Sequence, residues 1–182
     1  MIRFGLIIKG HYKNAFVLLA FLSLLTVAPS MAIGSGFEVY KGCFKDLKGW
    51  EHDNVEGMSM SYSGINMVTA NTRYTSGKKE VEVTFMEGSL PGMQQPNLDG
   101  TFEMETSEGS VKMKTINGKK VTIVHDKTNN TSTVAIILKE PKGENGPGAM
   151  LNFVGTNVGT KELLGFAQEF DWKCFEKKGH AR

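Results

Sequence analysis

The chain has 182 residues with 21 basic and 19 acidic side chains, and 40% of its residues are hydrophobic. Three of the bases and none of the acids lie in the first 32 residues, so residues 33–182 carry 18 bases against 19 acids and are close to neutral. This balance excludes a strongly basic nucleic-acid-binding protein, and the composition excludes an acidic disordered chain. The length is typical of one domain of ordinary size.

The N-terminal segment has the three parts of a secretory signal peptide. Three basic residues precede an apolar run at 16–28, and the small residues Ser30 and Ala32 follow it. The run is shorter than the roughly 20 residues that a membrane-spanning helix needs. We therefore predict a signal peptide at 1–32, with an uncleaved membrane anchor as the alternative.

Removal of this segment would leave residues 33–182 as a single globular domain. No second apolar stretch in this part reaches membrane length, so we expect no membrane span in the mature form. The charged end of the chain, 177–182, is expected to be a flexible tail. The protein is predicted to be periplasmic or secreted.

Two cysteines, Cys43 and Cys174, stand near opposite ends of the predicted domain. An exported protein meets an oxidising compartment, in which disulfides form and persist. Two isolated cysteines without a C-x-x-C spacing make a poor zinc site. We predict a disulfide between them, with two free thiols or a metal pair as the alternatives.

The hydrophobic pattern predicts an antiparallel sheet between two helical ends. Helical spacing occurs at 37–47 and at 160–170, whereas Glu80–Phe85 alternates in the manner of a half-buried strand, and Asn117-Gly118 marks a tight hairpin. Strand patterns lie at 65–74, 80–85, 102–106, 111–116, 119–125, 133–139 and 149–154. We therefore expect an α+β fold: an antiparallel meander of about six or seven strands, with a short N-terminal helix and a C-terminal helix packed on one face.

Methionine is the unusual residue of this composition, with 10 in the chain. Thioethers are soft ligands that suit Cu(I). Met58 and Met60 would share one face of a strand, and His52 lies six residues before Met58. These three residues are the candidate metal ligands, and copper is the one candidate cofactor. The competing interpretation is that methionine fills irregular cores and adaptable binding surfaces.

Familiar catalytic motifs are absent from the sequence. It contains no G-x-S-x-G, no H-E-x-x-H and no Walker loop. His52 has the acidic neighbours Glu51 and Asp53, with Glu56 nearby, but a serine–histidine–acid site requires a geometry that a sequence does not show. We therefore assign no catalytic and no cofactor-binding residue.

Several short stretches, taken as a set, resemble small exported bacterial proteins that remain uncharacterised. The element order is also similar, more loosely, to the fold of the photosystem accessory protein PsbP. These resemblances imply a non-enzymatic accessory or binding role and bring no catalytic residue. The stretches are Gly49-Trp50, Gly57-Met58-Ser59-Met60, Tyr74 and Gly77 before the 80–85 strand, Gly155-Thr156-Asn157-Val158 and Glu162-Leu163-Leu164-Gly165-Phe166-Ala167.

The leading functional hypothesis is an exported binding or accessory protein without enzymatic activity. Its partner would be an envelope protein, a lipid or a small ligand, and not a nucleic acid. A periplasmic Cu(I)-binding protein that uses His52, Met58 and Met60 is the first alternative. A hydrolase without a recognisable motif is the second.

Overall fold

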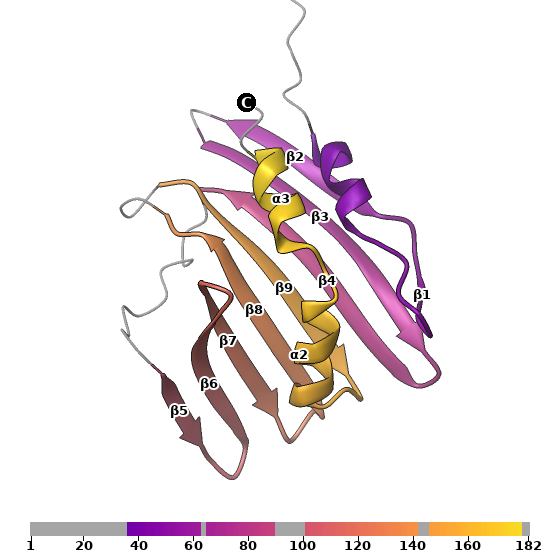
Figure 1. Ribbon diagram of the computed structural model, residues 1–182, viewed down its shortest axis with the longest axis vertical. Helices are drawn as coiled ribbons and strands as arrows, with labels where there is room; N and C mark the ends of the chain where they lie inside the picture. The colour runs from indigo at the N-terminus through magenta and orange to yellow at the C-terminus, as the bar shows by residue number, and fades with distance from the viewer. Residues whose placement is uncertain (1–35, 63–64, 90–100, 142–145, 180–182) are drawn as a thin grey trace, which may run out of the picture. The chain divides into compact units, whose positions relative to one another are not determined.

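The structure of the protein is a computed structural model that describes residues 36–62, 65–89, 101–141 and 146–179. The predicted signal peptide lies outside the described residues. Within these ranges the chain forms one nine-stranded sheet, a 3-10 helix and two α-helices (Figure 1). Their bounds are η1 Phe37–Cys43, β1 Glu51–His52, β2 Glu56–Tyr62, β3 Ile65–Ser76, β4 Lys79–Gly88, β5 Phe102–Glu105, β6 Gly109–Ile116, β7 Lys119–Asp126, β8 Thr131–Lys139, β9 Gly148–Thr156, α2 Thr160–Gln168 and α3 Trp172–Gly179.

The sheet consists of two antiparallel meanders joined side by side. Its strand order is β1-β3-β4-β9-β8-β7-β6-β5, and β2 pairs with β3 as well. The first meander runs from β2 to β4, and the second from β5 to β9. The pairing of β4 with β9, from Glu80↔Thr156 to Gly88↔Gly148, joins them into one sheet.

The expected single meander of about six or seven strands is therefore wrong. Two strands, β1 and β2, precede the first strand pattern that the sequence shows, and β4 pairs with β9 instead of with the next strand in the chain. The sequence hides β2 because its inward positions are small. Gly57 and Ser59 lie under η1, where a Cβ on Gly57 would stand 2.6 Å from Cγ of Phe37. The apolar alternation that reveals a strand is consequently missing.

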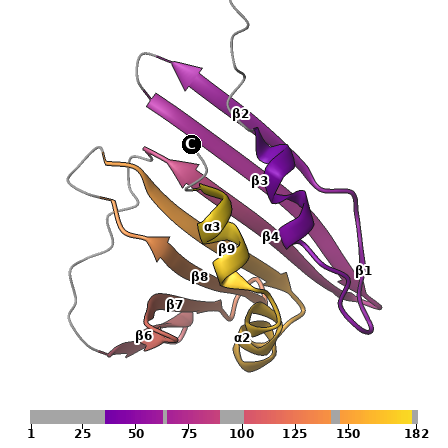
Figure 2. The same cartoon turned by 45° about the horizontal axis from the view of Figure 1, so that its top comes forward.

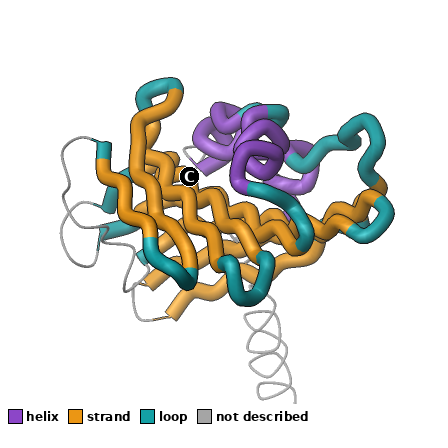
Figure 3. The backbone as a smooth tube through the Cα atoms, turned by 90° about the horizontal axis from the view of Figure 1, so that it is seen from below, coloured by secondary structure: helices purple, strands orange, loops and turns teal. Residues whose placement is uncertain are grey.

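All three helices lie on one side of the sheet (Figure 3). η1 contacts β2 and β3, whereas α2 contacts β7, β8 and β9 and α3 contacts β8 (Figure 2). Strand positions such as Val83 and Phe85 alternate with polar ones and are fully buried beneath the helices. Phe166 of α2 is the centre of an aromatic cluster, because its ring lies 4.9–6.2 Å from the rings of Trp50, Tyr74, Phe153 and Phe170.

The C-terminal helical region is two short helices rather than one. α2 ends at Gln168 and α3 begins at Trp172, whose indole N–H donates to the Ala167 carbonyl oxygen at 2.8 Å. This contact turns the chain so that Phe170 and Phe175 both reach the core. α3 continues through residues 177–179, which the sequence analysis placed in a flexible tail.

A disulfide joins the two ends of the domain. Cys43, the last residue of η1, and Cys174 in α3 have their sulfurs 2.08 Å apart across 131 positions of sequence. The described residues contain no free cysteine. The structure thus contains the pairing that the sequence predicts.

Candidate functional site

The register of the sheet decides which side chains share the face that the helices leave uncovered. Successive side chains of a strand point to opposite faces, and directly paired residues point to the same one. Phe85 contacts Phe175 of α3 and Phe153 contacts Phe166 of α2, so Met86, which follows Phe85, and its partner Met150 project from the other side. We call this other side the open face, because no helix of the described residues covers it (Figure 3).

Every methionine in the described part of the chain lies on the open face. On β2, Gly57 and Ser59 meet Phe37 of η1, which places Met58 and Met60 on the opposite side. The remaining strands follow from their pairing with β2, β4 or β9. The methionines on this face are Met58, Met60, Met67, Met86, Met104, Met113 and Met150.

The open face also holds all the large hydrophobic side chains that are exposed in the described residues. They form two groups, one on the edge strand β2 and one on the edge strand β5. Such side chains are scattered singly on an ordinary surface, whereas a gathering on one face marks an interaction site. Their exposed fractions are 52% for Met58, 43% for Met60, 73% for Tyr62, 36% for Phe102 and 48% for Met104.

A polar row runs between the two groups. Asn71, Thr84, Asn152 and Thr122 follow one another across β3, β4, β9 and β7, with Ala135 of β8 between the last two. This row therefore offers hydrogen-bonding groups that carry no charge themselves.

Some charged side chains of the open face form ion pairs with each other. Nε of Arg73 lies 3.1 Å from Oε1 of Glu80, and Nζ of Lys120 lies 3.0 Å from Oε1 of Glu140. Both pairs are on the surface, where such bridges contribute little to stability. Two more carboxylates of this face flank the polar row: Glu82 lies two positions from Thr84 on β4, and Glu56 pairs directly with Asn71.

The structure does not bring the three sequence-predicted metal ligands together. His52 pairs with Tyr74 on β3 and faces the helices, whereas Met58 pairs with Thr69 and faces the other way. Five positions of β3 separate the two pairs, a distance of about 17 Å along the strand. The ring nitrogens of His52 lie 2.9 Å from Oδ1 of Asp46 and 2.8 Å from the Asp53 carbonyl oxygen, so this side chain fixes the loop before β2.

A serine–histidine contact that the sequence analysis missed lies at the end of β7 and β8. Nδ1 of His125 is 3.1 Å from Oγ of Ser132, which pairs with it across the two strands. Ser132 is fully buried, and its hydroxyl donates to the Val158 carbonyl oxygen at 2.8 Å. The hydroxyl is thus committed to a buried acceptor, and the contact serves to hold the chain after β9 against the sheet.

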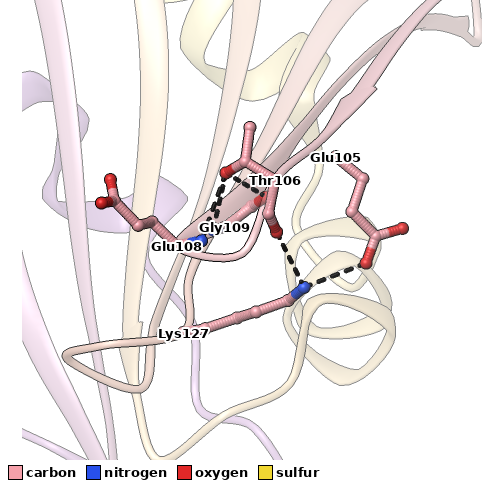
Figure 4. A network of polar contacts seen from close by, with 5 residues as sticks. All are labelled: Glu105, Thr106, Glu108, Gly109 and Lys127. Atoms are coloured by element: carbon pink, nitrogen blue, oxygen red, sulfur yellow. Dashed lines mark hydrogen bonds and ion pairs between the residues drawn. The ribbon is translucent and has the colours of Figure 1, made fainter.

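Beside this contact, the turn between β5 and β6 and the turn between β7 and β8 line an open pocket of about 370 Å³. The Thr106 hydroxyl accepts the backbone N–H of Gly109 at 3.2 Å, and Nζ of Lys127 lies 3.0 Å from Oε1 of Glu105 (Figure 4). Met104, Val111 and Val124 of the open face form the apolar part of the lining, and turn residues form the rest.

The two displaced pKa values of the described residues have structural causes. In the turn between β7 and β8, the backbone and side-chain N–H groups of Asn129 donate to Asp126, as in an Asx turn. These hydrogen bonds hold the pKa of the Asp126 carboxyl below its usual value. Burial raises the pKa of Tyr74 to about 12, and the Tyr74 hydroxyl donates to the Lys45 carbonyl oxygen at 3.0 Å. Both groups stabilise local structure.

No family model, curated protein or solved structure matches the chain. Among the described residues, no three side chains of histidine, cysteine, aspartate or glutamate come close enough to hold a metal ion. None of the helices in the described ranges has the length and hydropathy of a membrane-spanning segment. The open face is therefore the feature of this structure that most needs a functional explanation.

Proposed function

We propose that this protein is an exported binding protein without enzymatic activity, and that it docks its open face onto an apolar surface of a second protein of the cell envelope. One observation carries the proposal: the five exposed large hydrophobic side chains of the described residues all lie on this one face. Export has separate support in the Cys43–Cys174 disulfide and in the signal peptide predicted at residues 1–32.

The composition of the face favours a protein over a lipid as the partner. Protein interfaces are enriched in methionine and aromatic residues and depleted of charge at their centres, and they carry hydrogen bonds throughout. The open face has the methionine, the aromatic residues and the hydrogen-bonding groups of such an interface, with Asn71 and Asn152 between the two apolar groups. An acyl chain would leave the amides of this row without partners, which is costly. Methionine side chains are flexible and adapt to the surface they meet.

A photoreactive crosslinker tests the proposal at Tyr62, which is the most exposed of the five. The variant is expressed with its leader and crosslinked in intact cells, and the captured protein is identified, purified and titrated. Because a buried unpaired charge opposes docking, Met60→Lys and Met104→Lys are each expected to weaken the affinity by about tenfold or more. Gln168→Lys adds the same charge to an exposed position of α2 and is expected to leave the affinity unchanged.

Two results would refute this function. One is a crosslink to nothing except a second copy of the chain. The other is an identified partner whose affinity is the same for wild type and for both lysine variants of the open face.

A further inference from the structure

Three methionines at one corner of the open face are mutual neighbours. Met60 of β2 pairs directly with Met67 of β3, and Met58 projects from the same face two residues before Met60. Directly opposed Cβ atoms in an antiparallel pair lie about 4.5–5.5 Å apart, and diagonal ones about 7–8 Å apart. We call Met58, Met60 and Met67 the methionine triad. Three rotatable bonds in each side chain allow the three sulfurs to turn toward one point.

The surroundings of the triad leave room for the sulfurs to converge. On the far side of Met67, the paired residue of β4 is Gly88, which has no side chain. A larger residue cannot replace it, since a Cβ at Gly88 would lie 2.2 Å from the Asn66 carbonyl oxygen and its φ is 141°. About half of the Met58 and Met60 side chains is exposed, so an ion can enter from solvent.

We infer that the methionine triad binds one Cu(I) ion through its three thioether sulfurs. Soft uncharged sulfur ligands select Cu(I) over the hard divalent cations, which prefer oxygen. The cysteines do not compete for the ion, because Cys43 and Cys174 are joined in the disulfide. Two of these ligands, Met58 and Met60, are those expected from the sequence. The third is Met67, and His52 is not a ligand.

The inference uses the same face as the proposed function, but it does not depend on a protein partner. An apolar contact with a partner protein requires only apolar side chains, whereas coordination of Cu(I) at this site requires the sulfur atoms. Leucine has nearly the volume of methionine and lacks the sulfur, so Met→Leu substitutions separate the two roles.

The test is an anaerobic titration of the exported protein with Cu(I) against a chromophoric Cu(I) chelator. Ascorbate keeps the copper reduced, and a thiol reductant is avoided so that the disulfide stays intact. We expect one equivalent of Cu(I) with an all-sulfur coordination shell by X-ray absorption. Met60→Leu and Met67→Leu should each weaken binding by about tenfold or more. Met113→Leu, on the same face at β6, and His52→Asn should leave the affinity unchanged.

Three outcomes would overturn the inference: no stoichiometric binding, full binding by the Met58→Leu/Met60→Leu/Met67→Leu variant, or nitrogen in the coordination shell. Circular dichroism establishes that each variant is folded. If copper binding fails while Met60→Lys still loses the protein partner, the inference falls and the proposed function stands. If the leucine variants bind the partner and lose copper, both stand.

Discussion

Replacing both cysteines by alanine should remove a large part of the stability of the domain. In the chain-entropy description, a disulfide stabilises a protein by restricting the unfolded chain. For the 131-residue separation between Cys43 and Cys174, that relation gives a stabilisation of about 5 kcal/mol at 25 °C. The bond joins η1 to α3, so its loss removes the covalent link between these two helices.

Urea unfolding followed by tryptophan fluorescence measures this effect, since the buried Trp172 lies two residues from Cys174. With a slope of about 2 kcal/mol per molar urea, the Cys43→Ala/Cys174→Ala variant should unfold at a midpoint about 2.5 M lower. The slope should rise somewhat, because the unbridged unfolded chain is less compact and exposes more surface. A thiol reductant should bring the wild type to the midpoint of the variant and leave the variant unaffected.

A loss of stability below about 1 kcal/mol would refute this reasoning. It would mean that side-chain packing alone, such as the contact of Phe44 with Phe175, holds the two ends in the unbridged protein.

Three further changes test the packing. Phe166→Ala empties the centre of the aromatic cluster and should cost about 3–5 kcal/mol in urea unfolding, and a cost under 1 kcal/mol would contradict the assignment of this residue to the core. Gly57→Ala places a Cβ 2.3 Å from a backbone oxygen and against Phe37, so it should destabilise the protein by about 1–3 kcal/mol. Gly165 in α2 has open space around it, so Gly165→Ala should stabilise the protein by about 1 kcal/mol. Equal effects of the two substitutions would refute the close approach of η1 to β2. The raised pKa of Tyr74 means that between pH 10 and 12 the folded state keeps a proton that the unfolded state gives up. The associated stability is therefore present below pH 10 and is lost as the pH rises toward 12. Tyr74→Phe should remove this loss, and an identical dependence of unfolding free energy on pH in the variant would contradict the reasoning.

Local features of the fold could be predicted where one segment carries its own signal. The Asn117-Gly118 pair does form the hairpin between β6 and β7, with φ values of 51° and 75°. The alternation at Glu80–Phe85 does put Val81, Val83 and Phe85 in the core. With two cysteines in the chain, just one intramolecular pairing exists, so that prediction needed no knowledge of the fold.

Features that depend on distant partners could not be predicted. The insertion of β9 between β4 and β8 requires distant residues to pair, from Glu80↔Thr156 to Gly88↔Gly148, and no local pattern encodes that choice. β2 escaped notice because the small residues facing η1 conceal its period. The helix break before Trp172 depends on a tertiary hydrogen bond to Ala167.

The candidate site was visible in part. The abundance of methionine is visible in the sequence, and so is the pair Met58 and Met60, which lies on the open face at the edge strand β2. The addition of Met67 and the removal of His52 follow from register, because a shift of one position moves a side chain to the other face. Register in turn depends on which strands pair, and that is the information which the sequence alone lacked.

The junction of β4 with β9 has a consequence for the order in which the domain matures. Until β9 arrives, β4 presents an unsatisfied backbone edge, and such an edge can recruit a strand from a neighbouring chain. In a polypeptide that crosses a membrane N-terminus first, β9 is the last strand to emerge. The first meander therefore cannot pair with β9 until the other strands of the second meander have crossed. Pairing over such separations is slow. A nascent chain truncated before Gly148 would keep this edge bare, and we expect it to aggregate rather than to persist as half a domain.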